Sequence, residues 1–254
     1  MKSITKKLVC ILLSAILMCA SAATSFAESG CHWYIKRNGT DTPGFPAEAE
    51  KVSENGGYYI GNTEEKRIYL TFDAGYENGN IARILDTLKE EKVPAAFFLL
   101  DNIILKNTDL VIRMANEGHL VCNHTRNHKD LSHSDKCEIA ESLSSLEEIY
   151  REKTGNEMSK YFRFPEGKFS LEAMKCISEL GYKTVFWSFG YDDWDNCRQP
   201  DREKAMRKIL DNTHNGAIIL LHPTSKTNAD IMPALIREWR NMGYTFGTLD
   251  ELTA

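Results

Sequence analysis

Apolar residues gather into short runs from residue 67 onward, and amphipathic stretches separate the runs. Each run is rich in Ile, Val, Leu, Phe or Tyr, the residues that favour strands. The predicted strands are 67–73, 94–100, 119–123, 161–164, 183–188, 217–222 and 244–248. Because most of these runs are almost continuously apolar, they are typical of parallel strands that are buried on both faces.

The stretches between the strands have a helical period. Ile81, Ile84, Leu85 and Leu88 recur at i, i+3, i+4 and i+7, which places them on one buried helical face. Ser170 is a suitable N-cap for one further helix. Helices are expected over residues 81–92, 134–153, 171–180, 201–212 and 231–242. Gly155 is a plausible C-cap for the long second helix.

Strands that alternate with helices predict an α/β fold, a parallel sheet covered by helices. With seven strands in one domain, residues 66–254, the pattern favours a distorted (β/α) barrel of seven to eight strands. Residues 28–65 are polar and mix Gly, Pro and aromatic residues. We interpret them as an N-terminal extension that packs on the domain through its aromatic side chains and has no core of its own.

The first 27 residues have the pattern of a signal peptide. Lys2, Lys6 and Lys7 precede an apolar run at 8–20, and Ser25-Phe26-Ala27 places small residues at −3 and −1 of a cleavage site. An uncleaved membrane anchor is the alternative, but the run is shorter than the ~20 residues that span a bilayer. We therefore expect export across the cytoplasmic membrane, and no stable membrane span after cleavage.

The net charge and the cysteine spacing argue against some partners and some kinds of site. The formal net charge is −5, and loss of the three leader lysines makes the mature chain more acidic, which argues against nucleic acid as a partner. Five cysteines follow the leader without C-x-x-C spacing. Neither a disulfide framework nor a thiolate zinc site is indicated.

Polar residues with catalytic chemistry follow the predicted strands. His124 and His128 lie four residues apart, a spacing at which two imidazoles can converge on one divalent metal. Asp73 ends the first strand, and the active sites of barrels lie at the carboxyl ends of their strands. The other strand ends carry Arg163, Asp192, Asp193 and His222. This set predicts a metal-assisted hydrolase, although Asp73 could instead cap a helix and Arg163 could serve a structural ion pair.

Five ordered motifs resemble those of the polysaccharide deacetylases, carbohydrate esterase family 4 or the NodB-homology domain. They are T-F-D-A-G (71–75), H-T-R-N-H (124–128), R-F-P-E-G (163–167), D-W (193–194) and L-L-H (220–222). The string T-F-D-A-G-Y-E-N-G, with W-Y-I-K-R-N and Y-Y-I-G-N-T upstream, is similar to the delta-lactam-biosynthetic de-N-acetylases. These enzymes remove acetyl from N-acetylmuramic acid in spore cortex peptidoglycan.

The resemblance implies roles for the catalytic residues. Asp73 would be the general base, kept ionised and oriented by Arg163. His222 would be the general acid that protonates the leaving amine. Asp193 beside it would raise the pKa of His222.

The resemblance also implies residues that contact the substrate. The backbone amide of Tyr76 would stabilise the oxyanion. Trp194 and Leu220 would form the walls of the pocket for the acetyl methyl group.

Two positions depart from the family pattern. The usual motif T-F-D-D-G supplies a third metal ligand from its second aspartate, and this chain has Ala74 there. Glu77 or Asn78 in the same loop could replace that ligand. With His124 and His128 as ligands, we expect a transition ion, zinc first, with manganese or cobalt as alternatives. Gly190 also stands where many relatives carry an acid.

The implied activity is a metal-dependent de-N-acetylase acting on the glycan strand of peptidoglycan at N-acetylmuramic acid, on the route to muramic-δ-lactam. The alternatives are an N-acetylglucosamine deacetylase on peptidoglycan or chitin-type glycan, and an inactive glycan-binding module. We expect a monomer in the cell wall, the forespore intermembrane space or the extracellular medium.

Overall fold

The computed structural model describes residues 30–254, so the predicted signal peptide lies outside the described residues. The strands are β1 Cys31–His32, β2 Gly57–Tyr58, β3 Arg67–Ala74, β4 Ala96–Leu99, β5 Leu120–Asn123, β6 Ser159–Phe162, β7 Lys168–Phe169, β8 Lys183–Val185, β9 Ala217–Leu221 and β10 Thr245–Gly247. The helices are α2 Ala49–Glu54, α3 Asn80–Glu90, α4 Asp101–Lys106, α5 Thr108–Asn116, α6 Lys136–Thr154, the 3-10 turn Pro165–Gly167, α7 Leu171–Glu179, α8 Arg202–Leu210, α9 Lys226–Asn241 and α10 Leu249–Leu252.

The main sheet is parallel and curls into a distorted barrel. From β3 the strands β4, β5, β6 and β8 follow one another as hydrogen-bonded neighbours, while β9 pairs with the other side of β3. A parallel bridge between Phe189 and Ile219 joins the chain after β8 to β9 and closes the circuit. The short strand β10 pairs with the amino-terminal half of β3. The predicted barrel of seven to eight strands is confirmed.

Alternate residues of the strands fill the inside of the barrel. Tyr69, Phe98, Tyr161 and Ile218 belong to one buried cluster. Leu249 of α10 belongs to it too and covers the amino end of the strands. Side chains on one face of a strand recur every second residue. Further along each strand, toward its carboxyl end, every second position therefore also points inward. Those positions carry the polar side chains of the site.

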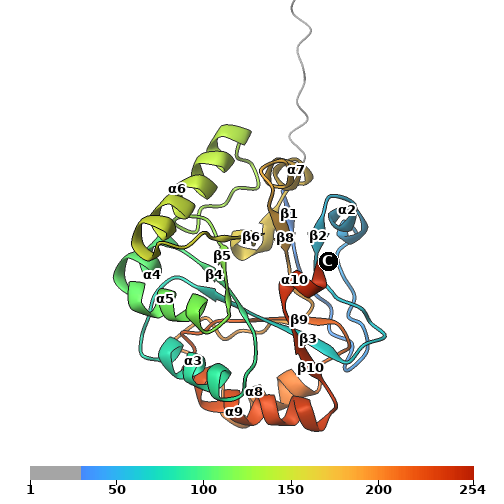
Figure 1. Cartoon of the computed structure of the whole chain (residues 1–254). Helices are drawn as coiled ribbons and strands as arrows, with labels where there is room; N and C mark the ends of the chain where they lie inside the picture. The colour runs from blue at the N-terminus through green and yellow to red at the C-terminus, as the bar shows by residue number, and fades with distance from the viewer. Residues whose placement is uncertain (1–29) are drawn as a thin grey trace, which may run out of the picture.

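The helices cover the outside of the sheet. In Figure 1, α3, α8 and α9 lie together along one side and α4, α5 and α6 along another. Their buried faces are apolar, as the fully buried Ile84, Leu85 and Trp239 show. No helix within residues 30–254 is both long and apolar enough to cross a membrane.

The N-terminal extension packs through aromatic rings. The ring of Trp33 stacks on Phe186 with centroids 4.6 Å apart and contacts Tyr59 at 4.9 Å. The sequence did not predict that the extension contributes a strand to the main sheet, where β2 pairs with β8. In Figure 1 this segment, in blue, lies close to α10 and the C-terminus.

Two further differences concern helices. Residues 101–116 form α4 and α5, which the sequence pattern did not indicate because neither is long enough to display a clear period. Helix α9 begins at Lys226 rather than at 231, because the Ser225 side chain accepts a hydrogen bond from the Asn228 amide and caps it.

Candidate active site

Asp73 lies at the carboxyl end of β3 and faces Arg163, which follows β6. The Arg163 Nη1 donates to the Asp73 Oδ1 across 2.8 Å. The Arg163 side chain is fully buried, and its other nitrogens donate to the Thr71 hydroxyl at 2.9 Å and to the Val185 carbonyl at 3.0 Å. The guanidinium also lies 4.2 Å from the centroid of the Phe98 ring. A planar cation held in this way fixes the orientation of the Asp73 carboxylate.

The pKa of Asp73 is lowered from its ordinary value. Burial alone would raise it, but the positive charge of Arg163 outweighs that effect. Asp73 therefore stays ionised at neutral pH and can accept a proton.

His124 and His128 follow β5 on a strained loop. Thr125 and His128 both have positive φ, 69° and 61°, a conformation that few residues other than glycine adopt. Asn123, fully buried, holds the turn because its Oδ1 accepts the Thr125 amide at 2.9 Å. The two imidazole centroids are 5.1 Å apart at an interplanar angle of 75°. The loop thus brings the two rings together, as their spacing predicted.

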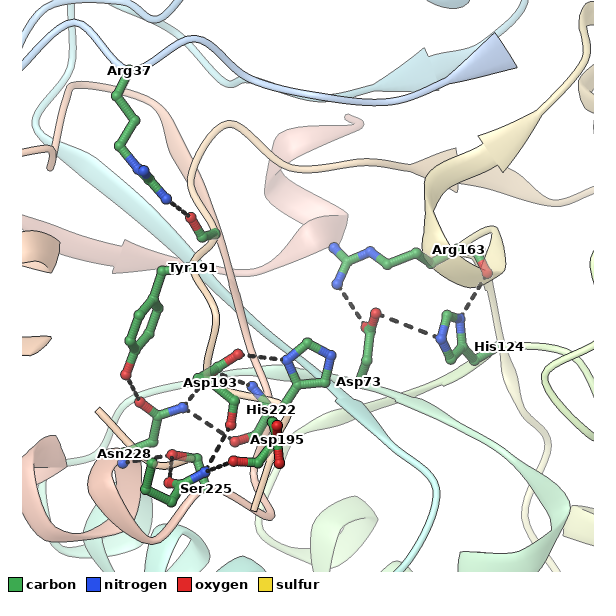
Figure 2. Close-up of polar contacts among 12 residues, drawn as sticks. Arg37, Asp73, His124, Arg163, Tyr191, Asp193, Asp195, His222, Ser225 and Asn228 are labelled. Atoms are coloured by element: carbon green, nitrogen blue, oxygen red, sulfur yellow. Dashed lines mark hydrogen bonds and ion pairs between the residues drawn. The ribbon is translucent and has the colours of Figure 1, made fainter. Parts of the chain in front are cut away.

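The ring of His124 is neutral and oriented. Burial lowers its pKa to about 4. Its Nδ1 lies 2.8 Å from the Arg163 carbonyl oxygen, so Nδ1 carries the proton and donates. The lone pair is then on Nε2, which lies 3.6 Å from the Asp73 Oδ2. Figure 2 shows Asp73 between Arg163 and His124.

The donor set fits a divalent metal in part. A neutral imidazole whose other nitrogen donates to a carbonyl is the usual form of a histidine ligand, and His128 lines the same cavity. However, residues 30–254 contain no group of three or more His, Cys, Asp or Glu side chains close enough to hold one ion. Ala74 also lines the cavity, and its methyl group cannot bind a metal.

Glu77 and Asn78, the residues expected to supply that ligand, have protein partners in this structure. The Glu77 carboxylate accepts the amides of Gly79 and Ile81 at the start of α3. The Asn78 side chain donates to the Thr224 carbonyl at 2.8 Å. Both side chains stabilise the loop through these hydrogen bonds, and neither lines the cavity.

His222 and Asp193 form a second pair across the cavity. The His222 Nδ1 lies 2.7 Å from the Asp193 Oδ1, and the His222 amide donates to Oδ2 at 2.8 Å. Burial alone would lower the pKa of His222, but the fully buried Asp193 carboxylate raises it above its ordinary value. A histidine held in its protonated form is suited to donate a proton.

Asn228 and Tyr191 support this pair, and the sequence did not single them out for it. The Asn228 Nδ2 donates to the Asp193 Oδ2 at 2.6 Å and to the His222 carbonyl at 3.1 Å. The Tyr191 hydroxyl donates to the Asn228 Oδ1, as Figure 2 shows. Both residues lie outside the five motifs, so only the folded arrangement reveals their contact with the site.

The two halves of the site line one cavity of about 730 Å³. Tyr76, Trp194 and Leu220 are among its lining residues, as the family resemblance implied, and Tyr76 and Trp194 are exposed at its rim. The cavity is also lined by two charged residues that the sequence did not single out as site residues, Arg37 and Glu166. Arg37 belongs to the W-Y-I-K-R-N segment of the extension, which was the one available signal.

Comparison with known proteins places this geometry in a family. A family model described as polysaccharide deacetylase matches residues 60–185. The chain is 36% identical over 245 residues to the peptidoglycan-N-acetylmuramic acid deacetylase PdaA of Bacillus subtilis, covering 94% of this chain and 92% of that protein. It is 31% identical over 193 residues to a peptidoglycan-N-acetylglucosamine deacetylase of Bacillus cereus, covering 74% of this chain and 88% of that one.

A solved structure agrees with the sequence similarity. The structure of Bacillus subtilis PdaA, described as a family 4 carbohydrate esterase, superposes with a TM-score of 0.85 at 36% identity, covering 88% of this chain and 97% of that one. The chain therefore belongs to the polysaccharide deacetylases of carbohydrate esterase family 4, hydrolases that act on the amide bonds of acetylated glycans.

Proposed function

We propose that this protein is a metal-dependent de-N-acetylase that removes acetyl from N-acetylmuramic acid in peptidoglycan. The observation that carries the proposal is that Asp73, held by Arg163, and His222, held by Asp193, line one cavity. Two titratable groups whose environments shift their pKa values in opposite directions are the arrangement that acid–base hydrolysis needs.

Asp73 and His222 divide the proton transfers. Asp73 accepts a proton from the water that attacks the acetamide carbon, and Arg163 keeps it ionised until then. His222 donates a proton to the nitrogen of the leaving amine, so that acetate and a free amine result. When a divalent cation is bound, His124 and His128 would hold it and it would act as a Lewis acid on the acetamide carbonyl.

The side chains at the rim suit a sugar ring. Trp194 is 57% exposed and Tyr76 45% exposed, although both are large aromatic residues. We assign Trp194 and Leu220 to the walls around the acetyl methyl group, and the Tyr76 backbone amide to stabilisation of the oxyanion.

The choice of N-acetylmuramic acid rests on similarity along the whole mature chain. PdaA of Bacillus subtilis, whose name gives that substrate, aligns with 94% of this chain, so the alignment includes most of the N-terminal extension. The N-acetylglucosamine deacetylase of Bacillus cereus aligns with 74% of this chain.

The amine that deacetylation produces could then attack the lactyl carboxyl of the same sugar and form muramic-δ-lactam with loss of water. We place the enzyme outside the cytoplasmic membrane, in keeping with the predicted leader and with a cell-wall substrate in the spore cortex.

Acetate release from defined glycans tests the proposal. Purified peptidoglycan strands and chitin oligosaccharides would be incubated with zinc, manganese or cobalt, and the products identified by mass spectrometry. Muramic amine or muramic-δ-lactam supports the proposal, while glucosamine as the sole amine supports the alternative substrate. Asp73→Asn should lower turnover roughly 10²–10⁴-fold, the usual contribution of a general base. Near-normal acetate release from that variant would contradict the assignment of Asp73.

An inactive glycan-binding module is a second candidate because of Ala74 and the incomplete ligand set within residues 30–254. A module of that kind would bind peptidoglycan and release no acetate with any of the three metals. The full set of Asp73, Arg163, Asp193 and His222 favours the enzyme, since a binding module would not need their hydrogen bonds.

A further inference from the structure

Among the residues of the described range 30–254 that line the cavity, Arg37 is the one with a permanent positive charge. Arg163 is buried behind Asp73, and its nitrogens are occupied by protein acceptors. The lining carboxylates are Asp73, Glu166 and Asp192, and the first two already have cationic partners, Arg163 and Lys168. Arg37 therefore supplies the permanent positive charge of this cavity lining.

The backbone that precedes Arg37 is held at two points, Trp33 and Lys36. Trp33 donates through its indole to the Trp187 carbonyl at 2.8 Å and through its amide to the Gly167 carbonyl at 2.8 Å. Lys36 exchanges two backbone hydrogen bonds with Gly44, at 2.8 and 2.9 Å. These backbone contacts fix the point from which the exposed Arg37 side chain projects, and its hydrogen bond to the Gly190 carbonyl directs the guanidinium to the cavity.

The guanidinium of Arg37 has donors to spare. Its Nη2 donates to the Gly190 carbonyl at 2.7 Å, as Figure 2 shows, and the group lies 5.8 Å from the centroid of the Phe189 ring. Within residues 30–254, no carboxylate lies in ion-pair distance of it. Arginine offers several N–H groups in a planar fork that matches a carboxylate, so most of this capacity is available.

Gly190 places that cation beside the wall of the cavity. A Cβ atom built on Gly190 would lie 3.4 Å from the Trp187 ring and 3.7 Å from the Leu220 Cβ. The anchor of Arg37 thus adjoins Leu220, which we assign to the acetyl pocket. A group bound by Arg37 would be close to the acetamide that the site cleaves.

We infer that Arg37 is a specificity-determining residue that binds a carboxylate on the substrate, the lactyl carboxylate of muramic acid. In that sugar the lactyl ether is on C3, next to the C2 acetamide, whereas N-acetylglucosamine has a neutral hydroxyl group there. The inference rests on the proposed function, because it deepens the choice between those two sugars.

The experiment compares Arg37→Gln with Lys36→Gln as a matched control. Lys36 is the exposed neighbouring cation and does not line the cavity. The substrates are muramic-containing strands with a free lactyl carboxylate, the same strands with that carboxyl converted to an amide, and chitin oligosaccharides. For Arg37→Gln, kcat/KM on the carboxylate strands should fall roughly 10- to 100-fold, the contribution of a charge-assisted hydrogen bond. On the other two substrates it should change by less than about 2-fold.

Three results would overturn the inference: an unchanged kcat/KM on the carboxylate strands, an equal loss on all substrates, or the same loss in Lys36→Gln. A binding measurement separates this inference from the proposed function. In the Asp73→Asn background, calorimetric titration of the carboxylate strands should show weaker binding when Arg37→Gln is added. If no variant and no wild-type protein releases acetate but this difference in binding persists, the proposed reaction fails and the role of Arg37 stands.

Discussion

At the residue scale, two aspartates of the site have different tasks because their partners differ. Asp73 faces a permanent cation, so its pKa is lowered and it remains a base. Asp193 is buried against a titratable partner, His222, and receives a further hydrogen bond from Asn228. The Asp193 charge therefore stabilises the protonated form of His222.

Asp193→Asn tests this division of roles through the pH profile. His222 with its raised pKa stays protonated to higher pH, so activity should fall only as the pH rises through that value. An amide at position 193 removes the charge that raises the pKa of His222. The alkaline limb of kcat should then move to lower pH, and maximal kcat should fall by roughly 10-fold or more. The measurement is acetate release from pH 5 to pH 10, and an alkaline limb that stays in place would contradict the role of Asp193.

At the element scale, the sequence predicted which strand ends carry chemistry but not how the loops hold it. The period-2 alternation of β3 places Tyr69, Thr71 and Asp73 on one face, and this follows directly from the strand pattern. The N-H-T-R-N-H spacing predicted two converging imidazoles. The sequence did not predict that the Glu77 carboxylate accepts backbone amides at the start of α3. Whether a carboxylate in that loop binds a helix end or a metal depends on the folded position of the loop. Arg37 and Asn228 were missed for the same reason.

The loop after β5 gives an element-scale prediction at Asn123. This side chain donates to the Leu143 carbonyl at 3.1 Å and to the Tyr182 hydroxyl at 3.2 Å, and accepts from the Thr125 amide. Asn123→Ala removes these three buried hydrogen bonds, including the acceptor of the Thr125 amide, so the free energy of unfolding should fall by about 1–3 kcal/mol.

Zinc binding should also weaken in Asn123→Ala, because the turn that orients His124 loses its support. Urea unfolding and calorimetric zinc titration provide the two measurements. Asn241→Ala serves as the control, since Asn241 is exposed at the end of α9 and its side chain makes one long hydrogen bond. Equal stabilities of the two variants would refute the role given to Asn123.

At the scale of the whole molecule, the site exists because the barrel closes. Asp73 and His222 are on β3 and after β9, neighbouring strands that are separated by most of the domain in sequence. His124 and Arg163 come from the opposite direction around the barrel, through β4, β5 and β6. Interactions that hold distant helices together therefore also maintain the spacing of the catalytic groups.

Asp230 on α9 is one such interaction, because it joins three helices. Its carboxylate accepts from Arg83 of α3 at 2.6 Å, Arg202 of α8 at 2.6 Å and Lys226 of α9 at 2.7 Å. The hydrogen bond from Lys226 and the charges around it lower the pKa of Asp230 to about 2, from an ordinary value of 3.8. Because the folded state lowers this pKa, the stabilisation is complete above pH 3.8 and is lost as the pH falls through about 2.

Asp230→Asn should therefore lower the free energy of unfolding by about 1 kcal/mol at pH 7, a modest value because the three cationic side chains are largely exposed. The loss should shrink as the pH approaches 2, where the wild-type carboxylate begins to be protonated, and also in high salt, which screens the charges. Urea unfolding at several pH values measures both effects, with Asp211→Asn at the exposed end of α8 as the control. A difference between wild type and Asp230→Asn that stays constant from pH 7 to pH 2 would mean that packing, rather than charge, joins these helices.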